Sequence, residues 1–263
     1  MTRPLISHYL VSALLLAAAV LAAAPSAAHA DEEYFSGSWP LRLVERPLVL
    51  GANMFELRGE TLRINMSKDS IGDPISLAPD LFYGVTDKLT VGVTHERGIC
   101  ISGDGCNDTI YDDLGVEVLF QLLRAGSLEL AAHGGVIVRS FDPFIAGPLL
   151  GVRARVALGN IGVVFDPSLY IGALERDLSG DFVDLPVQLQ YQLTHQNALF
   201  LRTGINGPLD GFGDNVAVPV GLGAVFVISR RVDVGGEFLF TNLAGNGGGV
   251  DGRLLLIRGA VRL

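Results

Sequence analysis

Residues 183–206 have the sequence VDLPVQLQYQLTHQNALFLRTGIN, and their alternation decides the fold. In the first half the odd positions are apolar, and the even positions are mostly polar: Asp184, Gln188, Gln190 and Gln192. Because side chains of a strand point alternately to opposite faces, this segment has one apolar and one polar face as a strand. A helix would scatter the same residues around its axis. After the polar residues 194–197 a second alternating run returns, so the stretch predicts a β-hairpin.

The same alternation recurs along the chain in about twelve segments, in which short connections alternate strictly with longer ones. One connection, Gly159-Asn160, is a two-residue hairpin turn suited to positive φ. In the first segment the alternation changes phase near Glu60, where a β-bulge would restore it. This pattern predicts an all-β fold, an antiparallel transmembrane β-barrel of about 12 strands with short periplasmic turns and longer extracellular loops.

Hydropathy supports a barrel over helical spans. The mean hydropathy is +0.41, yet no segment after residue 30 approaches the roughly 18 apolar residues that a spanning helix needs. In hydrocarbon the backbone polar groups must pair internally, which leaves a closed barrel as the way to span a membrane with strands. A soluble β-sandwich or lipocalin-like barrel also alternates. Such folds usually pack several large aromatic residues in a core, whereas one face of most segments here is rich in Gly, Gln, Asp, Glu and Arg.

The chain divides into three parts. Residues 1–30 contain Arg3, an apolar run and Ala28-His29-Ala30 before Asp31, which predicts a cleaved export signal. Residues 31–50 lack clean alternation and predict a periplasmic lead-in, partly inserted into the barrel mouth and too short for a plug domain. Residues 51–263 form the predicted barrel.

Charge and cysteine content narrow the environment. The formal net charge of −9 argues against nucleic acid as a partner, because nucleic acid favours basic stripes. An exported chain passes through an oxidising compartment, so Cys100 and Cys106 are expected to form a local disulfide.

If the apolar positions of each alternating segment face lipid, the polar positions between them line a lumen. The predicted pore-lining residues carry both charges: Glu117, Glu129, His133, Arg139, Arg153, Arg155, Asp184, Gln188, Arg202, Glu237 and Arg258. Twelve tilted strands give a backbone diameter of about 24 Å and a free width of about 10 Å. The lumen is then either a narrow diffusion channel or nearly closed by charges that pair across it.

No catalytic, metal or cofactor site is expected. His133 is the only histidine deep in a segment with lumen parity, and no Gly-x-Ser-x-Gly, His-Glu-x-x-His or Walker pattern occurs. Asp104, Asn107 and Asp108 match no calcium-loop template and are expected to form a solvated turn.

Several stretches resemble the outer-membrane transporters grouped with the meta-pathway of phenol degradation. They are Trp39-Pro40, residues 45–50 (ERPLVL), residues 55–57 (FEL), residues 83–89 (YGVTDKL), residues 185–187 (LPV) and residues 191–194 (YQLT). The resemblance implies a channel-like barrel that admits small organic compounds. It supplies no substrate-binding residue.

We therefore expect a passive channel or small-molecule uptake porin in a bacterial outer membrane. Its expected partners are outer-membrane lipids, the barrel-assembly machinery during biogenesis and small solutes. A closed structural or adhesin-like barrel with its function in the loops is the alternative, and a lipid-modifying membrane enzyme is a less favoured one.

Overall fold

The computed structural model describes residues 37–106 and 110–263. The predicted export signal, residues 31–36 of the predicted lead-in, and Asn107 and Asp108 of the Cys-containing loop lie outside the described residues. Within the described ranges, no helix has the length and apolar character needed to cross a membrane.

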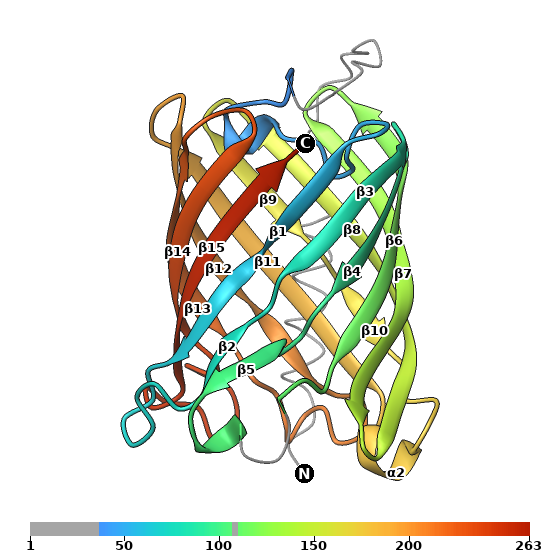
Figure 1. Cartoon of the computed structure of the whole chain (residues 1–263), viewed down its shortest axis with the longest axis vertical. Helices are drawn as coiled ribbons and strands as arrows, with labels where there is room; N and C mark the ends of the chain where they lie inside the picture. The colour runs from blue at the N-terminus through green and yellow to red at the C-terminus, as the bar shows by residue number, and fades with distance from the viewer. Residues whose placement is uncertain (1–36, 107–109) are drawn as a thin grey trace.

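The fold is one closed antiparallel sheet (Figure 1). Its strands follow chain order, and β15 pairs with β1 to close the barrel. Their bounds are β1 (Phe55–Asn65), β2 (Ile75–Leu77), β3 (Asp80–Thr86), β4 (Leu89–Thr94), β5 (Ile99–Ser102), β6 (Leu114–Ala125), β7 (Leu128–Phe141), β8 (Phe144–Leu158), β9 (Ile161–Phe165), β10 (Ser168–Tyr170), β11 (Phe182–Gln192), β12 (Asn197–Pro208), β13 (Val220–Val227), β14 (Val232–Phe240) and β15 (Arg253–Arg262). The pairs β2/β3, β4/β5 and β9/β10 are each one interrupted barrel strand, so the barrel has 12 strands, as the alternation predicted.

The hairpin predicted over residues 183–206 is formed by β11 and β12, which are paired in register from Phe182 with Pro208 to Gln192 with Ala198. The predicted bulge is also present, because the register between β1 and β15 shifts between Gly59 and Leu62. The turn at Gly159-Asn160 has a positive φ of 63° at Gly159.

Alternation places apolar side chains on the outside of the barrel. Many large apolar residues that would be buried in a soluble core are exposed: Val116, Val118, Phe120, Leu150, Leu189, Tyr191, Leu199, Leu201, Leu222 and Phe226. The polar residues between them face inward, and several are almost fully buried although the wall is a single sheet. The outer surface is therefore suited to hydrocarbon.

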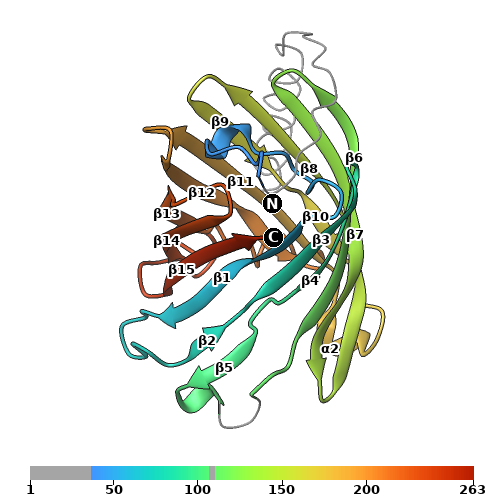
Figure 2. The same ribbon diagram turned by 45° about the horizontal axis from the view of Figure 1, so that its top comes forward.

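The two ends of the barrel differ. At one end, the turn end, the connections are short, and Leu263 lies there with the C-terminus (Figures 1 and 2). At the other, the loop end, the connections are mostly long and hold the short helices η2 (Asp104–Cys106) and α2 (Arg176–Ser179). The predicted strict alternation of short and long connections is wrong at one place: β7 and β8 are joined at the loop end by Asp142 and Pro143 alone. Because β7 and β8 extend to Phe141 and Phe144, their ladder occupies the length that a loop would otherwise fill.

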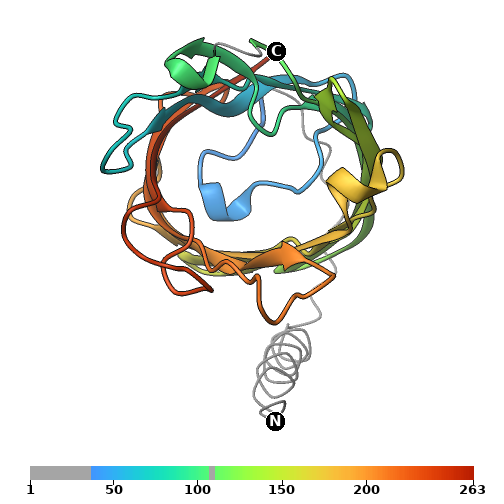
Figure 3. The ribbon, with the colours of Figure 1, turned by 90° about the horizontal axis from the view of Figure 1, so that it is seen from below.

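Residues 37–54, which include the short helix η1 (Leu43–Glu45), precede β1 and lie inside the turn end of the barrel (Figures 2 and 3). We call this segment the inner strap. Residues 37–50 of the predicted lead-in thus lie within the barrel.

Candidate functional site: a lumen crossed by an inner strap

The inner strap crosses the lumen and is held by strands from around the barrel (Figure 3). Its backbone amides donate to side chains of the wall: Val44 N to Gln192 Oε1 at 3.4 Å, Leu48 N to Glu129 Oε2 at 2.9 Å, and Leu50 N to Thr90 Oγ1 at 2.8 Å. An irregular segment inside a barrel needs such partners, because its backbone lacks those of a ladder.

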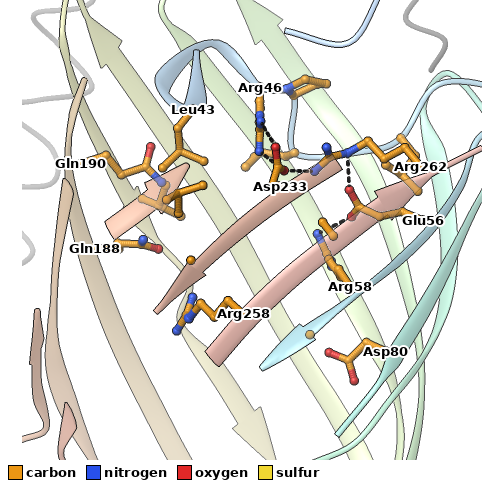
Figure 4. A pocket seen from close by; sticks show the side chains of 18 of the residues that line it. Leu43, Arg46, Glu56, Arg58, Asp80, Gln188, Gln190, Asp233, Arg258 and Arg262 are labelled. Atoms are coloured by element: carbon orange, nitrogen blue, oxygen red, sulfur yellow. Dashed lines mark hydrogen bonds and ion pairs between the residues drawn. The ribbon is translucent and has the colours of Figure 1, made fainter. Parts of the chain in front are cut away.

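Arg46 is the charged anchor of the inner strap. Its guanidinium donates two hydrogen bonds to the carboxylate of Asp233 on β14, at 2.7 and 2.8 Å, and a third to Pro40 O within the strap. Arg262 on β15 also donates to Asp233, at 2.7 Å (Figure 4). Burial lowers the pKa of the Arg46 guanidinium, and the hydrogen bond to Asp233 opposes that shift. The bidentate pair fixes the orientation of the strap as well as its position.

An apolar cluster forms the second anchor. From the strap, Trp39, Val49, Leu50 and Met54 pack against inward-facing residues of three wall strands: Phe82, Leu119 and Ala131. Sequence reasoning missed this cluster. The sequence did contain a signal for it. Near the turn ends of β3, β6 and β7, apolar residues occupy inward-facing positions, which are polar on neighbouring strands.

Gly84 on β3 allows the strap backbone to approach the wall. A Cβ at this position would clash with the carbonyl of Gly51. Gly84 also exchanges hydrogen bonds with the strap: Asn53 N donates to Gly84 O at 2.7 Å, and Gly84 N donates to Met54 O at 2.8 Å. The resemblance segment at residues 83–89 therefore includes a glycine that the strap requires.

A cavity of about 430 Å³ lies in the lumen against the strap. Strap residues Leu43, Arg46 and Leu48 line it on one side, and Gln188 and Gln190 of β11 line it on the wall (Figure 4). A smaller cavity of about 210 Å³ lies toward the loop end. The free width of about 10 Å expected for an empty barrel therefore does not apply at the turn end, because the strap occupies that space.

Ion pairs run along the barrel wall. Glu237 on β14 accepts from Arg202 Nε on β12, at 2.8 Å, and from Arg258 on the adjacent strand β15. Arg155 on β8 lies 3.0 Å from Glu129 on adjacent β7. These charges pair with residues on the same or nearby strands. They therefore do not have to pair across the lumen, which argues against the alternative that ion pairs close it.

A second wall network is centred on His133 of β7. Its Nδ1 lies 2.9 Å from Glu117 Oε1 on β6, and its Nε2 lies 3.0 Å from Asp166 Oδ1. Arg153 donates from Nε to Asp166 Oδ2 at 2.7 Å. Both ring nitrogens of His133 therefore lie against carboxylates, an arrangement typical of a structural polar network.

The predicted pore-lining residues all occur in these inward-facing groups. Arg153, Arg155, Gln188 and Arg258 line the larger cavity, and Arg139 and Asp184 line the smaller one. The remaining five predicted residues form ion pairs with those arginines or with each other: Glu117, Glu129, His133, Arg202 and Glu237.

At the loop end, Cys100 and Cys106 are joined by a disulfide with a Cα–Cα distance of 5.4 Å. Among residues 37–106 and 110–263, no group of three or more His, Cys, Asp or Glu side chains is arranged to hold a metal ion.

Comparisons with known proteins give a fold and no family. No family model matches the sequence, and no curated protein matches it. Two of the solved structures that are similar to the barrel are outer-membrane proteins. The NanC porin has a TM-score of 0.56 at 10% sequence identity, covering 79% of this chain and 98% of that one. An outer membrane channel from Pseudomonas putida F1 has a TM-score of 0.53 at 15% identity, covering 82% of this chain and 97% of that one. This chain therefore has the fold of outer-membrane β-barrels.

Proposed function

We propose that this protein is a narrow passive channel for small solutes in a bacterial outer membrane. The observation that carries the proposal is the 430 Å³ cavity within the closed barrel, bordered by charged side chains that pair along the wall. A lumen filled for structural reasons alone would be expected to pair its charges across the centre.

The outer surface supports the membrane location. The apolar side chains exposed around the barrel match a lipid environment, and the backbone polar groups of a closed sheet are paired. With this location the turn end faces the periplasm, as in other barrels with short periplasmic turns. Lipids of the outer membrane and the barrel-assembly machinery are then the partners of the proposed channel.

The inner strap limits the size of the solute. Small molecules fit a cavity of this volume, and the strap leaves less room at the turn end than an empty 12-stranded barrel would. The resemblance to transporters of the phenol meta-pathway type extends the proposal to small organic compounds.

Planar lipid bilayers test the proposal. The purified, folded full-length chain should insert and produce discrete single-channel current steps, which detergent alone should not produce. Sealed bilayers that contain folded, inserted protein but show no steps would refute the channel and favour a closed structural barrel. Liposome swelling with sugars, amino acids and small aromatic compounds would then rank the solutes.

A further inference from the structure

The larger cavity contains many guanidinium groups. Of the described residues that line it, six are arginines: Arg46, Arg58, Arg153, Arg155, Arg258 and Arg262. Four are acidic: Glu56, Asp80, Asp166 and Asp233. The numbers of positive and negative side chains are similar, so the charge that a solute meets depends on which side chains are accessible in the cavity.

In the wall ion pairs formed by Arg58, Arg202 and Arg258, the arginine is the more accessible partner. The Arg58 side chain is 36% exposed, whereas its partner Glu56 is 2% exposed. Arg202 and Arg258 are 27% and 25% exposed, whereas the Glu237 carboxylate that both contact is 0% exposed. At Arg58 and Arg258, which line the cavity, a solute therefore meets the guanidinium more readily than the carboxylate paired with it.

Two carboxylates in the cavity are more accessible than the others. Asp80 is 23% exposed and accepts a hydrogen bond from His95 N, and Asp166 is 24% exposed and lies against Arg153 and His133. At the loop end the order reverses in one pair, because Glu96 is 54% exposed and its partner Arg139 is 25% exposed. In the cavity beside the strap, where the lumen is narrowed, Arg58 and Arg258 are more accessible than the carboxylates with which they pair.

We infer that this cavity is an anion-binding site that makes the channel selective for small anions, carboxylates in particular. The inference rests on the proposed channel function. A guanidinium presents a planar set of donors that matches a carboxylate, and the amides of Gln188 and Gln190 add donors on the facing wall (Figure 4). Rings of charged side chains at the narrow part of a pore set its ion selectivity.

The expected selectivity is opposite to the net charge of the chain, which is −9. A channel governed by total charge would favour cations. At about 0.1 M salt the screening length is about 10 Å, so charges on the wall act across the narrowed lumen while those of distant loops are screened.

The reversal potential across a KCl gradient measures this selectivity. Full-length protein should pass chloride more readily than potassium. The double substitution Arg58→Gln with Arg258→Gln should move the reversal potential toward zero, and Arg58→Lys with Arg258→Lys should keep it near that of the unsubstituted protein. Arg176→Gln is the matched control, because Arg176 lies in α2 at the loop end with its side chain 65% exposed and pairs with Asp181. Unselective or cation-selective current from the unsubstituted protein would overturn the inference.

A binding measurement separates this inference from the channel proposal. Trp39 is the single tryptophan of the chain and lines the cavity. Succinate should change its fluorescence saturably, the neutral amide succinamide should not, and Arg58→Gln with Arg258→Gln should abolish the change. Saturable binding without conductance would refute the channel and retain the anion site. Conductance with neither succinate binding nor anion preference would refute the anion site and retain the channel.

Discussion

Replacing Trp39 by alanine should loosen the inner strap while leaving the barrel intact. The Trp39 side chain is 3% exposed and packs in the apolar cluster at the turn end, with the Arg262 guanidinium 5.1 Å from its ring. Removal of a buried tryptophan typically costs about 3–5 kcal/mol. The strap contributes no strand to the sheet. The lost packing energy should therefore weaken docking of the strap and leave the strand pairing unchanged.

Hydrogen exchange of the strap amides measures the change. The amides of Val44, Leu48 and Leu50 donate to side chains of the wall, so they are protected only while the strap is docked. Since each 1.4 kcal/mol is tenfold, a loss of about 3–5 kcal/mol should lower their protection by about 10²- to 4 × 10³-fold in Trp39→Ala. The amides of the β11–β12 ladder should keep theirs.

Tyr191→Ala is the matched control, because it removes a large aromatic side chain from the outer face, where Tyr191 is exposed. It should leave the strap amides unchanged. Intact protection of the strap amides in Trp39→Ala, or an equal loss of protection in the ladder amides, would refute this prediction.

Two further predictions concern single features. Gly84→Ala places a Cβ against the carbonyl of Gly51 and should displace the strap, seen as a red shift in the emission of the single tryptophan; Gly236→Ala, whose Cβ would meet only an ordinary contact, should not. A red shift of equal size in both variants would contradict the role assigned to Gly84. The Cys100–Cys106 disulfide predicts that a thiol reagent labels the intact protein only after reduction, and ready labelling beforehand would contradict it.

The barrel was predictable because its information is local. Every second residue of a strand faces the same side, so a short alternating segment such as residues 187–192 reveals both faces without knowledge of its neighbours. Chemistry then identifies the faces, since Gln188 and Gln190 suit water and Leu189 and Tyr191 suit lipid. The number of strands followed from counting such segments.

The inner strap was harder to predict, because its position depends on residues distant in sequence. Phe82, Leu119 and Ala131 lie on different strands, and each alone is only an apolar residue at a polar position. They form a docking surface once the barrel brings them together. The ion-pair partners within the wall likewise depend on register: Arg155 lies directly opposite Glu129 in the β7–β8 ladder, a pairing that composition does not specify.

The central claim is that the polar face of this ribbon lines the path that solutes take, and two adjacent residues of β11 test it. Gln188 lines the cavity and Leu189 is exposed on the outer face, and the two native cysteines are joined in a disulfide. A charged, water-soluble methanethiosulfonate reagent added during single-channel recording should lower the current of Gln188→Cys in one step per channel. It should leave the current of Leu189→Cys unchanged. A current drop in Leu189→Cys, or complete modification of Gln188→Cys with no change in current, would contradict the account.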